Sequence, residues 1–269
     1  MKRKIMAIFT AFIVAMTILI PHYANATEPN NSETVYKDLD GNGYVTKEIN
    51  ELELIKELLK NDDQTLIDFG LSQEEINRYK QFVSQSKARN SQIKTGKLTY
   101  TVKWYKDSFK YSKGKTYIKS NLSWSWSTKP IVVETDIVAM GTNENFAVKS
   151  GSAKGHVNYY LKGSKTTANK TVISKTVYTK GNGTCAYFKF PMLQTREPGP
   201  QLKYALGGSM TVEWVKSGNI KFVAIGGNYG HSTLSINPEV SISGTEVGIS
   251  FTPSKSIKTG AEALINASR

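Results

Sequence analysis

The segment from Asp38 to Thr46 has oxygen-bearing residues at a regular spacing that suits a hard cation. Side-chain oxygens of Asp38, Asp40 and Asn42 stand at the first, third and fifth positions, and the sixth position is a glycine that permits a sharp turn. The carbonyl of Tyr44 and the hydroxyl of Thr46, acting through water, would add two further ligands. The sequence therefore predicts that these residues bind Ca²⁺.

This spacing resembles the calcium loop of EF-hand proteins, and more closely the loop and helix of dockerin modules in exported bacterial proteins. The resemblance covers about a dozen residues and the helix expected after them, Lys47 to Lys60. It departs from the pattern at the twelfth position, where Ile49 replaces the acid that binds calcium through both oxygens. Glu48 lies one residue early and Glu51 two residues late. The resemblance implies Ca²⁺ as a weakly bound structural cofactor.

The same residues also fit a plain β-hairpin. Thr34-Val35-Tyr36 would pair with Tyr44-Val45-Thr46, and the segment between them contains the Asp-Gly and Asn-Gly pairs that hairpin turns favour. Calcium loop and hairpin both stay open as interpretations of this segment.

Trp124, Trp126 and His231 form a second candidate site, a ligand surface. The two tryptophans share one face of a strand, where aromatic side chains can bind carbohydrate but more often fill the core, and we favour the core. His231 beside Ser232 suggests a hydrolase, yet neighbours in a strand point to opposite faces, and no pair of carboxylates marks a catalytic site. The glycines within Gly226 to Ser232 predict a turn between strands.

Short segments of alternating apolar and polar residues follow one another from Lys97 to Pro253. Leu98 to Trp104 and Leu122 to Ser127 are examples. Ile131 to Met140 is apolar on both sides of the alternation, which predicts a central strand buried on both faces. Cys185, the single cysteine, lies in such a segment, so we expect a buried thiol. This pattern predicts a mainly β fold, an antiparallel β-sandwich or barrel.

A helical period before these strands predicts a small N-terminal helical unit. Its clearest boundary signal is a capping box, in which Ser72 caps the helix and Glu75 reaches back to it. The predicted organisation is a helical unit with the calcium loop at 27–84, a polar linker at 85–96, a β-sandwich at 97–257 and a C-terminal tail at 258–269.

Residues 1–26 have the features of a secretory signal peptide. A basic start, Lys2-Arg3-Lys4, precedes an apolar run from Ile5 to Ile20, and Ala24-Asn25-Ala26 offers small residues for cleavage. No later segment is long and apolar enough to span a membrane. We expect a secreted, extracellular protein that begins at Thr27, and its lysine-rich composition without paired cysteines resembles exported proteins of Gram-positive bacteria.

The positive charge of the chain is concentrated in its β-rich part. Residues 97–269 carry 23 Lys and Arg and 9 Asp and Glu, a net charge of +14, while residues 27–96 are net acidic. Such a charge favours anionic partners, and we expect an anionic cell-envelope polymer or lipid surface. Nucleic acid is a poorer partner because the lysines are spread over strands without a basic run or a recognition motif.

Three functions compete at this point. The first is a non-enzymatic binding protein for anionic envelope polymers or surfaces. The second is a membrane-active, pore-forming-like β-protein, because Thr171 to Thr179 and Ser235 to Thr252 alternate as the strands of membrane barrels do. The third is a secreted hydrolase. The sequence indicates no oligomeric state.

Overall fold

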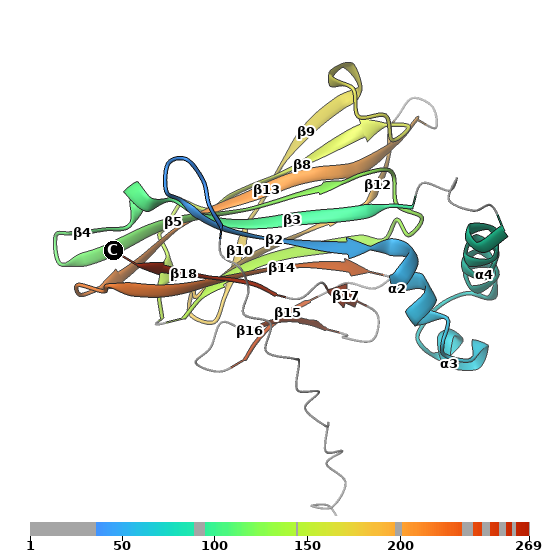
Figure 1. The fold of residues 1–269 in the computed structure, drawn as a ribbon, viewed down its shortest axis with the longest axis horizontal. Helices are drawn as coiled ribbons and strands as arrows, with labels where there is room; N and C mark the ends of the chain where they lie inside the picture. Colours follow the sequence, from blue (N-terminus) through green and yellow to red (C-terminus); the bar gives the residue numbers. More distant parts are fainter. Residues whose placement is uncertain are drawn as a thin grey trace, which may run out of the picture. The chain divides into compact units, whose positions relative to one another are not determined.

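The computed structural model describes residues 36–88, 95–143, 145–196, 201–232, 239–243, 248–252, 257–259 and 262–268. Residues 34–269 form one compact unit in which antiparallel strands predominate (Figure 1). The predicted mainly β fold with an N-terminal helical segment is therefore confirmed. The predicted signal peptide lies outside the described residues.

The first sheet has ten strands among the described residues, and every pair is antiparallel. Its main path runs β1-β2-β3-β5-β13-β8-β9, with β4 beside β5 and with β7 and β12 beside β13. The strands are β1 (Tyr36–Lys37), β2 (Gly43–Asn50), β3 (Lys97–Trp104), β4 (Lys110–Ser112), β5 (Lys115–Trp126), β7 (Ala147–Val148), β8 (Lys154–Leu161), β9 (Lys170–Lys175), β12 (Leu193–Arg196) and β13 (Gln201–Ser217).

The second sheet is also antiparallel and follows the order β10-β11-β6-β14-β17, with β18 paired to β14. A separate two-stranded sheet consists of β15 and β16. The strands are β6 (Thr135–Thr142), β10 (Tyr178–Lys180), β11 (Cys185–Pro191), β14 (Phe222–Ser232), β15 (Glu239–Ser243), β16 (Gly248–Thr252), β17 (Ile257–Thr259) and β18 (Ala263–Ser268).

The main core lies between the two large sheets. Period-2 alternation turns every second side chain of β3 and β5 inward, where these side chains meet residues of β6, β11 and β14. Gly227 permits a close approach of the sheets, since a Cβ there would lie 2.3 Å from Val102 Cγ2 and 3.1 Å from Leu122 Cδ1. The layers therefore pack as a β-sandwich.

The helices α2 (Glu51–Leu58), α3 (Asp63–Asp68) and α4 (Gln73–Ala88) follow β2 and precede β3. The predicted capping box is present: Ser72 N–H donates to Glu75 Oε2 (2.8 Å) and Glu75 N–H donates to Ser72 Oγ (3.2 Å). The helices share a small apolar core with Val132 of the β-rich part, formed by Ile55, Leu58, Leu66, Leu71, Ile76 and Tyr79. Among the residues that the structure describes, we find no helix with the length and apolarity needed to cross a bilayer.

Element boundaries depart from the sequence predictions in several places, and α4 extends to Ala88, into the predicted linker at 85–96. The helix expected from Lys47 begins at Glu51, because Val45 and Ile49 are buried in β2, which pairs with β3. The segment Gly226 to Ser232 is not a turn but part of β14, where its glycines fit between packed layers. The predicted tail at 258–269 contains β18, whose alternate residues enter the main core. The central strand expected over Ile131 to Met140 is present as β6, which is buried over nearly its whole length but begins only at Thr135.

Candidate functional site

Three of the residues predicted to bind calcium, Asp38, Asp40 and Asn42, form the turn between β1 and β2. Asp38 Oδ1 accepts hydrogen bonds from the N–H groups of Asp40 (3.1 Å) and Asn42 (2.9 Å), and Oδ2 accepts one from the Asn42 amide (3.0 Å). Lys103 pairs with Asp38 Oδ2, and the Lys106 N–H donates to the Asn42 side-chain oxygen (2.9 Å). The hydrogen bond from Lys103, followed by that from Asn42, lowers the pKa of Asp38 to about 2. The turn is thus tied to the residues around β3.

Tyr44 and Thr46 lie beyond this turn, in β2. Tyr44 is opposite Tyr36 and stacks on it with ring centroids 5.6 Å apart, while the Thr46 hydroxyl hydrogen bonds with that of Thr101 (2.9 Å). Within the described ranges, no three acidic, histidine or cysteine side chains are grouped to hold a metal ion. Calcium binding stays a prediction, and Lys103 would compete with the ion for Asp38.

Trp124, Trp126 and His231 are buried inside the sandwich, with exposed fractions of 4%, 0% and 0%. The Trp124 ring stacks on Phe190 with centroids 5.2 Å apart, and Trp126 packs on the His231 imidazole at 4.9 Å. These side chains do not form the exposed ligand surface considered from the sequence. The core interpretation is correct because both tryptophans face the second sheet.

His231 belongs to a buried cluster of charged side chains. Its Nδ1 lies 3.0 Å from both carboxylate oxygens of Asp136, which also accepts hydrogen bonds from the Tyr229 hydroxyl (2.5 Å) and the Ser232 N–H (3.0 Å). Its Nε2 lies 3.9 Å from Glu51 Oε1. Glu51, Asp136 and His231 are fully buried, so we call these three residues the buried charge cluster.

The buried charge cluster joins three elements, because Glu51 starts α2, Asp136 lies in β6 and His231 in β14. Burial lowers the pKa of His231, but Asp136 and then Glu51 outweigh burial and raise that pKa to about 10. The two carboxyl groups therefore favour the protonated form of His231. Among the described residues, His231 Nε2 has no hydrogen-bond partner, and the Ser232 hydroxyl donates to the Thr135 carbonyl. Ser232 and His231 therefore do not form the nucleophile–base contact of a hydrolase.

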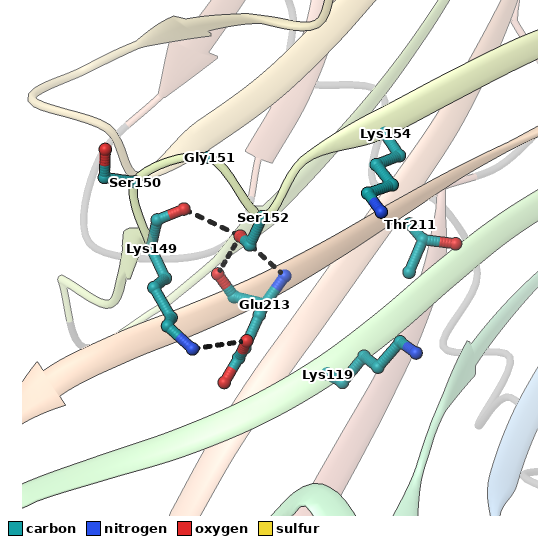
Figure 2. A pocket seen from close by; sticks show the side chains of 8 residues that line it. All are labelled: Lys119, Lys149, Ser150, Gly151, Ser152, Lys154, Thr211 and Glu213. Atoms are coloured by element: carbon teal, nitrogen blue, oxygen red, sulfur yellow. Dashed lines mark hydrogen bonds and ion pairs between the residues drawn. The ribbon is translucent and has the colours of Figure 1, made fainter.

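An open basic pocket lies on the outer face of the first sheet (Figure 2). Its volume is about 380 Å³. It is lined by Lys119, Lys149, Ser150, Gly151, Ser152, Lys154, Thr211 and Glu213. Strand pairing brings these residues together, because Glu213 of β13 is opposite Lys119 of β5 and Thr211 is opposite Lys154 of β8.

The charges of the basic pocket divide into a matched pair and two further cations. Lys149 Nζ contacts Glu213 Oε2 at 2.8 Å, and Ser152 Oγ fixes the loop by donating to the Lys149 carbonyl (2.7 Å). Lys119 and Lys154 then add two positive charges, and their side chains lie on either side of Thr211 (Figure 2). Lysine and threonine side chains that share one pocket can donate hydrogen bonds to an anion with several oxygens, such as phosphate.

Sequence reasoning missed this pocket because its residues come from three segments that are separate in the sequence, around Lys119, Lys149 to Lys154, and Thr211 to Glu213. Lys119, Lys149 and Lys154 meet only once β5, β13 and β8 are paired in the observed register. The net positive charge of the β-rich part indicates an anionic partner, but it does not show which residues bind that partner.

The sheet of β15 and β16 covers part of the second sheet. Its Val240, Ile249 and Phe251 are buried against an apolar group that includes Ile137, Ala139 and Cys185. Asn228 Nδ2 donates to the Ile249 carbonyl (3.2 Å), and Lys180 Nζ donates to the Val240 carbonyl (2.5 Å). The expected buried thiol is confirmed, and burial raises the pKa of Cys185 to about 12.

No protein-family model and no curated protein matches this chain. Among solved structures, a protein described as "Pore forming protein" is 9% identical, with 87% of this chain and 94% of that chain covered and a TM-score of 0.28. The delta-toxin of Clostridium perfringens is 9% identical, with 89% and 94% covered and a TM-score of 0.23. The membrane-inserted NetB toxin of the same organism is 9% identical, with 63% and 88% covered and a TM-score of 0.25. These TM-scores are low, so the similarity is distant.

Proposed function

We propose that this chain is an extracellular protein that associates with anionic, phosphate-bearing surfaces through the basic pocket. The observation that carries the proposal is the placement of Lys119 and Lys154 on either side of Thr211, with Glu213 already paired to Lys149. A phosphate group would accept from both ammonium groups and from the threonine hydroxyl. Polyol-phosphate polymers of the envelope and lipid headgroups both present such groups.

The net charge of the β-rich part supports the same function. A charge of +14 on residues 97–269 attracts a polyanion over a distance, and the pocket gives one of its phosphates a defined position. Binding of this kind weakens with salt, because exposed charges are screened beyond the Debye length, about 10 Å at 0.1 M ionic strength.

The test replaces Lys119→Gln together with Lys154→Gln and measures binding to inorganic polyphosphate and, separately, to vesicles containing phosphatidylglycerol. Each lost charge-assisted hydrogen bond should weaken binding on the order of tenfold. The control is Lys162→Asn with Lys170→Gln, which removes the same charge from residues outside the pocket. Equal affinities of the pocket variant and the unmodified protein for both probes would contradict the proposal, and a loss with one probe alone would identify the source of the phosphate.

A second candidate function is a membrane-active β-protein, and the sheet of β15 and β16 favours it. This sheet is separate from the two large sheets and buries Val240 and Phe251 while leaving Glu239 and Ser250 exposed. An amphipathic strand pair can exchange a protein surface for lipid, since its apolar side chains stay out of water in both places.

Cys185 offers a direct test, because it is the single cysteine and lies under β15 and β16. If this sheet leaves the body on phosphatidylglycerol vesicles, a maleimide should label Cys185 faster at the same time as the vesicles release a trapped dye. Cys185→Ser controls for labelling elsewhere. Dye release with unchanged labelling would show that another segment acts, and no release would exclude a membrane-permeabilising function under those conditions.

A further inference from the structure

Two neighbouring turns carry a concentration of positive charge outside the basic pocket. Residues 110–116 comprise β4, the turn after it and the start of β5, and residues 216–222 run from the end of β13 to the start of β14. We call these two segments together the double turn. Neither segment contains an acidic residue. The lysines of the double turn are Lys110, Lys113, Lys115, Lys216 and Lys221.

Hydrogen bonds between the segments give the double turn a defined shape. Gly218 N–H donates to the Gly114 carbonyl (2.9 Å), Thr116 Oγ1 donates to the Gly218 carbonyl (2.6 Å), and Ile220 N–H donates to Thr116 Oγ1 (2.9 Å). Lys113 and Gly114 both have positive φ, 50° and 75°, as a tight hairpin turn requires. Figure 1 shows both turns at the same end of the sheets, at the left of the view.

Apolar side chains are exposed on the same turns. Phe222 is 70% exposed and Tyr111 is 44% exposed, although most large apolar side chains of the described residues are in the cores. Aromatic rings beside lysines suit the boundary between lipid headgroups and acyl chains, where the ring leaves water and the ammonium group stays near phosphate. A soluble polyanion would use the lysines without using Phe222.

We propose that the double turn docks on an anionic lipid bilayer, with its lysines at the headgroups and Phe222 at the interface. The inference rests on the proposed association with anionic surfaces and adds a second contact whose partner is a bilayer. Lys115, Tyr117 and Lys119 lie on the same face of β5 at two-residue spacing, so the double turn is about 13 Å from the basic pocket along the strand.

The first experiment compares two charge variants in binding to vesicles of phosphatidylcholine with and without phosphatidylglycerol at low salt. Lys113→Asn with Lys115→Gln should weaken binding to the anionic vesicles about thirtyfold, from two charges near the surface. Lys162→Asn with Lys170→Gln is a matched control. Lys162 also begins a Lys-Gly turn with positive φ, but it follows β8 at the end of the β8–β13 pair that lies away from the double turn. Equal losses in both variants would show that diffuse charge, and not the double turn, binds the bilayer.

The second experiment measures the position of residue 222 in the bilayer. The four native tryptophans are 6% exposed or less, so Phe222→Trp adds an exposed reporter. Its emission should shift to the blue on anionic vesicles and be quenched by brominated lipid, whereas Tyr178→Trp, at another exposed aromatic position, should not be quenched. Absence of quenching at residue 222 would overturn the proposed docking.

Inorganic polyphosphate separates this inference from the proposed function. The double-turn variant should bind polyphosphate within about threefold of the unmodified protein, since one isolated phosphate site remains in the pocket. If the pocket variant loses polyphosphate binding but still docks on vesicles, the double turn binds the bilayer and the pocket binds a phosphate polymer instead of lipid. If instead the pocket variant loses binding to both probes while the double-turn variant docks normally, the inference about the double turn is wrong and the proposed function is unaffected.

Discussion

The buried charge cluster and the basic pocket use similar charged groups in opposite ways. In the cluster, His231 lies between Asp136 and Glu51 with no exposed surface, so its charges interact with one another. In the pocket, Lys119 and Lys154 are open to solvent beside a matched Lys149–Glu213 pair. A buried charge without its partner is costly, whereas an exposed charge is available to a ligand. The comparison predicts that the cluster determines stability and the pocket determines binding.

The largest effect is expected from removing one charge of the buried charge cluster. Asp136→Ala leaves His231 with Glu51 at 3.9 Å and removes the acceptor of three hydrogen-bond donors. The free energy of unfolding should fall by about 3–5 kcal/mol, as for other broken buried pairs. Denaturant titration measures this loss, and Glu213→Gln is the matched control, because breaking that exposed pair should cost about 1 kcal/mol or less. Equal losses of unfolding free energy in Asp136→Ala and Glu213→Gln would contradict the different roles of the buried charge cluster and the basic pocket.

The next effect is a loss of stability as the pH rises. The pKa of His231 is about 10 in the folded protein and 6.5 for an ordinary histidine, so folding favours the protonated form. The stability that His231 contributes is complete below about pH 6.5 and is lost as the pH rises through about 10. Unfolding free energies measured across this interval should fall with pH, and the fall should be smaller in His231→Gln. A flat profile of the unmodified protein would contradict a charged His231.

The pocket variant should have a much smaller effect on stability. Lys119→Gln with Lys154→Gln changes exposed side chains without a buried partner, so the free energy of unfolding should stay within about 0.5 kcal/mol. Thermal melting in parallel with the binding measurement provides the comparison. A large destabilisation would mean that these lysines stabilise the folded sheet and that ligand binding is not their main role.

The smallest effect concerns calcium at the turn between β1 and β2. If the sequence prediction is correct, Asp38, Asp40 and Asn42 bind Ca²⁺ with a dissociation constant on the order of 10⁻⁴ to 10⁻³ M, because the usual bidentate acid is missing. The competing Lys103 contact with Asp38 weakens binding further. Calorimetry should show heat in the unmodified protein and none after Asp38→Ala with Asp40→Ala. Heat that persists in the double variant would place the ion elsewhere.

The sequence predicts local features of this molecule better than its long-range contacts. Alternation is a local pattern, so the strand around Leu98 and the buried β6 were found, as was the capping box at Ser72. In the sequence, Glu51 stands out only as an acid two residues beyond the last calcium-ligand position, because its contact with His231 depends on how α2 meets β14. The sequence predicts a tail where β18 lies, because its small residues, such as Ala263 and Ala267, give a weak pattern and reach the core only through the pairing of β18 with β14.

The packing of β18 near β2 has a consequence for the order of folding. A Cβ at Gly43 in β2 would lie 3.0 Å from the Ile265 side chain in β18, so segments near the two ends of the described sequence meet in one core. Such contacts require closing a very long loop, which slows folding and delays the gain in stability until the loop is closed. Until β18 has arrived, β2 lacks one of its packing partners, and the sandwich stays open along that edge. We therefore expect the packing of β18 against β2 to be a late step of folding. In a chain without β18, proteases should have access to β2 and β14.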